Sequence, residues 1–123
     1  VGINGAEPWT DEMRRKIEEL LNVNSFDIYG LCEITGPGVA LDCIHHKGMH
    51  VQEDYFYPEV LNPTDHTPCK DGETGELVFT TLVKEGMPLL RYRTKDLQVL
   101  IIQNVSVEEH FRESINLQDV QMI

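Results

Sequence analysis

The chain has 123 residues, enough for one ordinary domain or for part of a larger one. Because 41% of its residues are hydrophobic and 25% are charged, it has the composition of a globular protein rather than a disordered one. The net charge of −11 argues against non-specific binding to nucleic acid or to an anionic membrane, whose phosphates would be repelled, but it allows a phosphate ligand held by backbone N–H groups.

No apolar run approaches the length needed to cross a bilayer, and no signal peptide is visible. The three cysteines, Cys32, Cys43 and Cys69, are an odd number and too sparse for a disulfide scaffold, so we expect a reducing, cytoplasmic setting. The first residues form an apolar run without an initiator methionine, and we therefore expect an internal piece of a longer chain.

A strand–helix–strand unit is predicted for residues 1–37. Residues 1–8 indicate a short strand that ends at the sequence GAEP, and Thr10 is placed to cap a helix over residues 11–22. Apolar residues recur there at helical spacing: Met13, Ile17, Leu20 and Leu21. Residues 25–30 follow as a second strand, and a helical crossover between two strands is typical of a parallel α/β sheet.

Residues 38–97 predict a mainly antiparallel β-rich subdomain, which makes the fold class α/β (α+β). Its short β-type runs are separated by turn residues and cover 38–44, 49–54, 57–62, 75–82 and 88–94. Residues 98–123 predict a strand followed by a helix, with a capping box from Ser106 to Glu109, as a βα tail that starts a C-terminal domain.

Two turns follow the two strands of the first unit. Since parallel strands end at the same sheet edge, the GAEP turn is expected beside the sequence DIYGLCE, and ligands of open α/β sheets bind at such edges. Gly30 allows a close backbone approach, Tyr29 offers a ring for stacking, and Glu33 is an oxygen ligand suited to Mg²⁺. The plain alternative is two ordinary loops with one exposed acid.

The sequence RYRTKD closes the β-rich region. Strand alternation predicts that Arg91 and Arg93 share one face, and Asp96 can accept two hydroxyl hydrogen bonds, as from a ribose diol. A solvated strand with an Arg–Asp pair is the alternative.

Cysteine and histidine cluster in CIHHKGMH. The cluster contains Cys43, His45, His46 and His50, and the spacing of Cys43 and His50 can chelate zinc across a turn. A structural zinc needs four ligands, and Cys69 and His66 are the other obvious candidates. A polar hairpin with exposed histidines is the competing interpretation. The chain has no dinucleotide fingerprint, P-loop lysine motif or nucleophile elbow.

Five blocks in order give the chain a resemblance to the adenylate-forming superfamily, and specifically to phenylacetate–CoA ligases: GAEPWTDEMRRKIEE, FDIYGLCEITGPGVA, HVQEDYFYPEV, GETGELVFTTL and MPLLRYRTKDL. The resemblance covers about residues 1–97. It implies an AMP-forming acid–thiol ligase that activates phenylacetate or a similar aryl acid with Mg-ATP, and then transfers the acyl group from the adenylate to CoA.

The resemblance also implies roles for single residues. Gly5, Ala6, Glu7 and Pro8 would line the adenine and acyl pocket, and Asp27, Tyr29 and Gly30 would hold adenine. Cys32 would approach the α-phosphate, although the family usually has Ser or Thr there and a thiol is a weaker donor. Glu33 would match the Mg²⁺ ligand, and Asp96 the ribose-binding acid.

The family's phosphate loop, its Cys-Pro-Cys-Gly segment and its catalytic lysine have no counterpart in these 123 residues. We therefore expect a segment that is inactive alone and contains no catalytic residue, with small-molecule partners only. Exposed sheet edges and apolar surface predict a homo-oligomer or a self-associating chain. Two alternatives stay open: a non-catalytic zinc-binding structural module, and another adenylating activity on the same scaffold.

Overall fold

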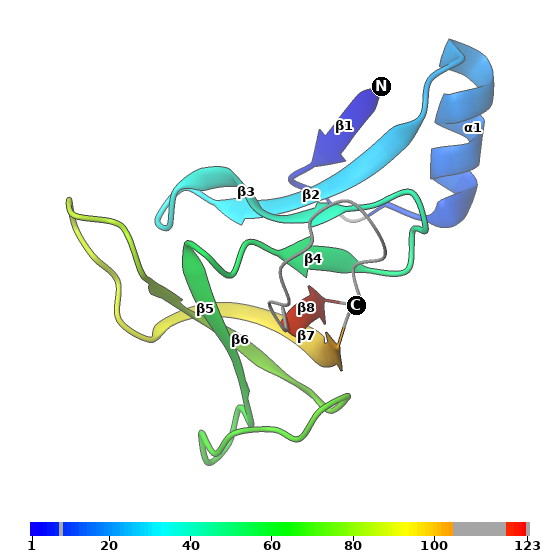
Figure 1. Cartoon of the computed structure of the whole chain (residues 1–123). Coiled ribbons are helices and arrows are strands. Elements are labelled where there is room, and N and C mark those ends of the chain that lie inside the picture. Colours follow the sequence, from blue (N-terminus) through cyan, green and yellow to red (C-terminus); the bar gives the residue numbers. More distant parts are fainter. Residues whose placement is uncertain (8, 105–117, 123) are drawn as a thin grey trace. The chain divides into compact units, whose positions relative to one another are not determined.

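The structure is a computed structural model that describes residues 1–7, 9–104 and 118–122. Its contacts divide the chain into two units, residues 1–52 and residues 53–123, and Figure 1 shows the elements of each. Strands outnumber helices in the described part, so the α+β class predicted from the sequence is confirmed. The domain boundaries expected after residues 37 and 97 stay a prediction.

The first unit begins with the predicted crossover. β1 (Gly2–Gly5) runs parallel to β2 (Ser25–Leu31), and α1 (Asp11–Leu21) connects them. Thr10 caps α1 as expected, since its hydroxyl accepts a hydrogen bond from the Met13 N–H at 3.2 Å. The helix ends at Asn22, whose left-handed backbone (φ 51°) turns the chain back toward β2.

The first unit then continues with two antiparallel strands. β3 (Gly36–Asp42) pairs with β2, and β4 (Met49–Val51) pairs with β3. The order within this sheet is β1-β2-β3-β4. Ile34, Val39 and Ala40 are fully buried, so the core of the unit lies under the β2–β3 hairpin.

The β2–β3 pairing is irregular at the glycine-rich segment. Tyr29 pairs with Ala40 and Gly30 with Pro37, so two residues of β3, Gly38 and Val39, lie opposite no residue of β2. Gly38 has φ 102°, which favours glycine over any residue with a side chain. The bulge thus depends on the sequence GPG that follows the turn.

The second unit is an antiparallel sheet with the order β8-β7-β6-β5. β5 (Phe56–Leu61) pairs with β6 (Thr74–Thr81), β6 with β7 (Tyr92–Asn104), and β7 with β8 (Gln118–Met122). The core consists of apolar side chains of β5 and β6, with Leu77, Val78 and Phe79 fully buried. The continuous apolar run LVF therefore marks a strand covered on both faces.

One prediction about this unit needs revision. The strand expected over residues 88–94 begins only at Tyr92, because Met87 (φ 55°) and Arg91 (φ 50°) have left-handed backbones that an extended strand does not allow. The tail strand is present as the second half of β7. The predicted capping box from Ser106 to Glu109 lies outside the described residues, and β8 was not expected.

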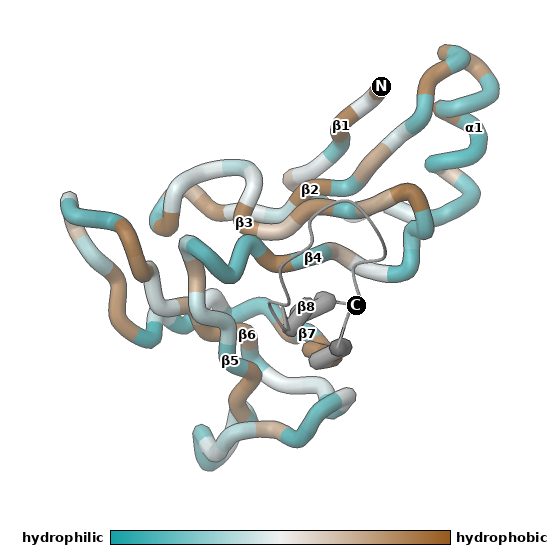
Figure 2. Tube along the Cα trace, in the orientation of Figure 1, coloured by the Kyte–Doolittle hydropathy of each residue, from teal (hydrophilic) through white to brown (hydrophobic). Residues whose placement is uncertain are grey.

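Helix α1 is amphipathic, yet none of its eleven residues is buried. Met13, Leu20 and Leu21 are 51%, 72% and 67% exposed, and Figure 2 shows the hydrophobic colour at the C-terminal end of the helix. In the part of the chain that the structure describes, no helix is both long and apolar enough to cross a membrane.

The close approach of β3 to β2 gives the first prediction. A Cβ added at Gly30 would lie 2.1 Å from the Gly36 carbonyl oxygen, a backbone atom that cannot move aside cheaply. We expect Gly30→Ala to lower the free energy of unfolding by roughly 1–3 kcal/mol, measured by urea denaturation.

Gly86→Ala is the matched control, because a Cβ there meets no atom within 4 Å and its backbone shows no positive φ. Equal stabilities for the two variants would show that the β2–β3 approach at Gly30 is not as tight as described.

Candidate functional site

The carboxyl ends of β1 and β2 bring the two sequence-predicted turns together. Gly5 pairs with Ile28 in the parallel register, so the GAEP turn leaves β1 beside the point where β2 reaches Tyr29 and Gly30. The adjacency expected from the strand–helix–strand order is therefore present. It follows from the parallel pairing alone, since both turns leave the same sheet edge.

The first turn exposes its polar groups. Ala6 has a left-handed backbone (φ 74°), and both Ala6 and Glu7 are exposed. Pro8 lies outside the described residues. At Gly5 a Cβ would meet the Ile28 carbonyl oxygen at 2.6 Å, so contact with β2 requires glycine here independently of any ligand.

On β2, Asp27 and Tyr29 are both half-buried. The Asp27 carboxylate accepts a hydrogen bond from the Ile28 N–H at 2.9 Å, which orients this side chain within β2. Gly30 is exposed, and its missing side chain makes room for the β3 backbone. The structure thus supplies a protein contact as the reason for this glycine, where the sequence suggested a ligand.

The turn between β2 and β3 presents Cys32 and Glu33 to solvent. The N–H groups of Ile34 and Thr35 both donate to the Leu31 carbonyl oxygen, at 3.1 and 3.2 Å, and the fully buried Ile34 side chain anchors the turn from below. Cys32 is a free, exposed thiol. The buried anchor gives the two neighbouring exposed residues a defined position.

Cys43, which directly follows β3, and His50 on β4 also come together. Burial raises the pKa of the Cys43 thiol, but hydrogen bonds from the His45 backbone and the His50 side chain outweigh it, so this pKa is lowered overall. Among the side chains that the structure describes, no group of three or more His, Cys, Asp and Glu residues is arranged to hold a metal ion. Cys43 and His50 thus form a pair without a third such residue arranged around a metal position among the described side chains.

An ionic cluster that the sequence analysis missed joins α1 to the end of β3. The Asp42 carboxylate, only 3% exposed, lies 2.5 Å from His46 Nδ1 and 4.0 Å from the Arg14 guanidinium, and it accepts the Cys43 N–H at 2.8 Å. The Arg14 guanidinium carbon also lies 5.7 Å from the centre of the Trp9 ring. Because Asp42 and Arg14 are 28 residues apart in the chain, no local sequence pattern indicated their contact.

The two arginines of RYRTKD have different partners. Arg91, outside the strand, donates to the Glu59 carboxylate at 3.1 Å through both Nε and Nη2, whereas Arg93 on β7 donates to Glu76 on β6. Glu59 pairs with Val78, and Glu76 stands two residues before Val78 on β6, so both acceptor carboxylates lie on one face of the β5–β6 pair. That the two arginines share one face stays a prediction.

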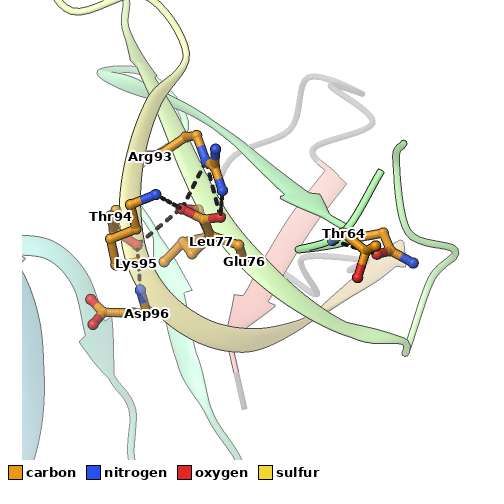
Figure 3. Close-up of polar contacts among 8 residues, drawn as sticks. Thr64, Glu76, Leu77, Arg93, Thr94, Lys95 and Asp96 are labelled. Carbon is orange, nitrogen blue, oxygen red and sulfur yellow. Dashed lines mark hydrogen bonds and ion pairs between the residues drawn. The ribbon is translucent and has the colours of Figure 1, made fainter. Parts of the chain in front are cut away.

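Glu76 is the second residue that the sequence analysis missed. Its side chain is 5% exposed, accepts from Arg93 Nε at 3.0 Å and lies 3.6 Å from the Lys95 ammonium group, as Figure 3 shows. The hydrogen bonds from Arg93 lower the pKa of Glu76, and the Glu76 carboxylate in turn raises the pKa of Arg93. An acid before a buried apolar run is the only signal that could have indicated it.

Asp96 lies in the second unit, just beyond this ion pair. Its carboxylate is exposed, and its N–H donates to the Thr94 hydroxyl at 3.1 Å. Figure 3 shows the Asp96 carboxylate directed away from Glu76. The residue is thus held through its backbone while its acid faces outward.

Two surface hollows also occur, one in each unit. The first, of about 240 Å³, is lined by Asp11, Arg14, Arg15, Glu18 and His46. The second, of about 230 Å³, is lined by residues of β5 and of the loop before β6, including Tyr57 and Cys69. Neither of these two hollows is lined by a candidate nucleotide-binding residue.

Curated relatives match most of the chain. It is 56% identical over 102 residues to the phenylacetate–CoA ligase of Escherichia coli K12 and 57% identical over 102 residues to that of Pseudomonas putida, in each case 82% of this chain. The Thermus thermophilus enzyme is 54% identical over 97 residues. Over this segment the chain belongs to the phenylacetate–CoA ligase family. It spans 23% of the length of the first two relatives.

Solved structures agree on the fold. A 2-hydroxyisobutyryl-CoA ligase in an open conformation, in complex with 2-HIB-AMP and CoA, superposes with a TM-score of 0.74 at 22% identity, covering 83% of this chain and 24% of that one. The same ligase in its thioesterification state gives a TM-score of 0.73 at 21% identity. These matches show the adenylate-forming fold. No protein-family model matches the chain.

The Glu76–Arg93 pair gives the second prediction. Because the folded pKa of Glu76 lies below its unfolded value of about 4.3, the pair contributes stability above that pH, and the contribution is lost as pH falls through the folded pKa. We expect Glu76→Gln to lower the urea midpoint at pH 6 and to differ progressively less from the wild type as pH falls below about 4.

Glu85→Gln, which removes an exposed carboxylate from the β6–β7 loop, is the control for general charge effects. A midpoint difference between Glu76→Gln and the wild type that is constant from pH 7 to pH 3 would contradict the assignment of the pair.

Proposed function

We propose that the chain forms part of an AMP-forming acid–CoA ligase that activates phenylacetate or a similar aryl acid. The observation that carries the proposal is the 54–57% identity to phenylacetate–CoA ligases over 97 to 102 residues of this chain. The reaction would join the carboxylate to AMP with release of pyrophosphate, and the CoA thiol would then displace AMP.

The paired turns of the first unit are the proposed nucleotide surface. Gly5, Ala6 and Glu7 with the neighbouring Pro8 would line the adenine and acyl pocket, and Asp27, Tyr29 and Gly30 would hold adenine. The adjacency of the two turns at one sheet edge supports this assignment, as does the half-buried Tyr29, which offers a ring for stacking.

The exposed hairpin turn is proposed to face the phosphates. Glu33 would serve as a Mg²⁺ ligand, since carboxylate oxygen suits this hard cation, and Cys32 would approach the α-phosphate. Mg²⁺ would neutralise charge that develops on the phosphoryl oxygens. This chemistry needs charge stabilisation and orientation more than a protein nucleophile, which fits a chain without a catalytic triad.

A zinc half-site at Cys43 and His50 is proposed beside this function. The lowered pKa of Cys43 favours the thiolate, which is the form that binds metal. Two ligands do not complete a structural zinc site, so the alternative of an independent zinc-binding module has less support than the ligase. The three free cysteines favour a reducing, cytoplasmic setting.

The third prediction concerns nucleotide binding by the isolated 123-residue chain. We expect isothermal titration to detect AMP and Mg-ATP, with Asp96→Asn weakening AMP about tenfold through loss of hydrogen bonds to a charged acceptor. Glu33→Gln is expected to weaken Mg-ATP but not AMP, because it removes a metal ligand. Glu85→Gln controls for the change in net charge.

The same samples test activity. The chain lacks counterparts of the family's phosphate loop and catalytic lysine, so we expect no thioester from phenylacetate, ATP and CoA. Thioester formation would contradict inactivity of the chain alone, and activation of a different acid would favour another adenylating activity. Absence of any nucleotide binding would contradict the nucleotide-surface assignment.

The fourth prediction is self-association, motivated by apolar side chains that the described units leave exposed. Leu20 and Leu21 end α1, and a second exposed set occurs in the β6–β7 loop: Leu82, Val83, Met87 and Leu90. We expect sedimentation velocity to show concentration-dependent association, weakened about tenfold or more by Leu20→Gln with Leu21→Gln. Lys16→Gln on the same helix is the control. A single monomeric species at high concentration would be the opposite result.

A further inference from the structure

The strand pairing between β6 and β7 breaks just before Asp96. Val78 pairs with Arg93 and Glu76 pairs with Leu97, so a single β6 residue, Leu77, lies opposite three β7 residues, 94–96. Lys95, in the middle of the three, has a left-handed backbone (φ 71°). A bulge of this kind redirects side chains and leaves ladder groups to be satisfied in another way.

The Thr94 side chain forms hydrogen bonds with two backbone groups at the bulge. Its hydroxyl donates to the Leu77 carbonyl oxygen at 2.9 Å and accepts from the Asp96 N–H at 3.1 Å. One hydroxyl therefore closes the bulge onto β6 and fixes the backbone of Asp96, as Figure 3 shows. Because a β-branched residue has few χ1 rotamers, the bridge costs little side-chain entropy.

Glu76 holds the residues on either side of Thr94. Its carboxylate accepts from Arg93 and lies 3.6 Å from the Lys95 ammonium group, and its side chain is 5% exposed. Each of the three residues before Asp96 therefore has a side-chain contact with β6: Arg93, Thr94 and Lys95. The Asp96 carboxylate is directed away from Glu76, as Figure 3 shows. Side-chain contacts with β6 thus hold the backbone of the bulge in place, and the exposed Asp96 follows directly.

We propose that Thr94 is a positioning residue for nucleotide binding, whose hydroxyl bridge presets the Asp96 carboxylate to accept both hydroxyls of a ribose diol. This inference rests on the proposed function, which assigns ribose contact to Asp96. A carboxylate accepts hydrogen bonds from both hydroxyls of a diol only over a narrow range of orientations. If the Asp96 backbone is already held before the nucleotide binds, less conformational entropy is lost on binding.

The test measures ribose discrimination. Dissociation constants for AMP and for 2′,3′-dideoxy-AMP are determined by isothermal titration with the wild-type chain, Thr94→Val, Thr94→Ser and Asp96→Asn. We expect the wild type to prefer AMP about tenfold. Asp96→Asn and Thr94→Val should reduce this ratio to within about twofold, and Thr94→Ser, which keeps the hydroxyl, should retain it.

Thr81→Val is the matched control for lost stability. The Thr81 hydroxyl also donates to a carbonyl, that of Leu89 at 3.3 Å, and accepts an N–H, that of Leu89 at 2.9 Å. This contact joins the end of β6 to the β6–β7 loop, away from Asp96 in the sequence. We expect Thr81→Val to lose stability like Thr94→Val and yet keep the AMP preference. If Thr94→Val does not fold, Thr94→Cys replaces it, since a thiol is a weaker donor and acceptor and should give an intermediate ratio.

The outcomes separate the two proposals. A wild-type preference that Asp96→Asn abolishes and Thr94→Val leaves intact would overturn the role of Thr94 and keep that of Asp96. Equal loss of the ratio in Thr81→Val and Thr94→Val would reduce Thr94 to a general structural role. A wild type that shows no preference, or no nucleotide binding, would overturn the ribose contact and the inference together.

Discussion

The backbone of β2 approaches both of its neighbours so closely that neither contact leaves room for a side chain. A Cβ at Gly5 on β1 would lie 2.6 Å from the Ile28 carbonyl oxygen of β2, and a Cβ at Gly30 on β2 would lie 2.1 Å from the Gly36 carbonyl oxygen of β3. These glycines set where β1 and β3 lie against β2. The positions of the GAEP turn and of the Cys32–Glu33 turn follow from them, because each turn leaves a strand that such a contact fixes.

The sequence predicts this part well because the information is local. Thr10, the helical apolar spacing and the two flanking strands specify a parallel crossover, and the parallel register then brings the two turns together. The strand predicted over residues 75–82 is also present, as β6. Its continuous apolar run is a local pattern, and these side chains fill the core of the second unit. Motif order added a family assignment that composition and periodicity could not supply.

What the sequence could not predict depends on pairs that are distant in the chain. Asp42 contacts Arg14, which lies 28 residues earlier in the chain, and Glu76 contacts Arg93, which lies 17 residues later. No local periodicity links such residues, because the first pair depends on how α1 packs against β3 and the second on how β6 pairs with β7. The left-handed backbone at Arg91 is a similar case: β7 begins only after it, at Tyr92, whereas the sequence pattern predicted a strand from residue 88.

The same irregularity recurs at both places proposed to contact the nucleotide. In the first unit, β3 has two more residues than β2 between the pairs Tyr29–Ala40 and Gly30–Pro37. In the second unit, β7 has two more residues than β6 at the position of Leu77. Regular antiparallel pairing sends successive side chains to alternate faces and leaves little freedom in their direction. A bulge breaks that constraint at one point, at the cost of ladder hydrogen bonds that other groups must replace. Glycine accommodates the first bulge and the Thr94 hydroxyl closes the second, so this chain uses breaks in its sheets, held rigid by local contacts, to aim the groups of its proposed site.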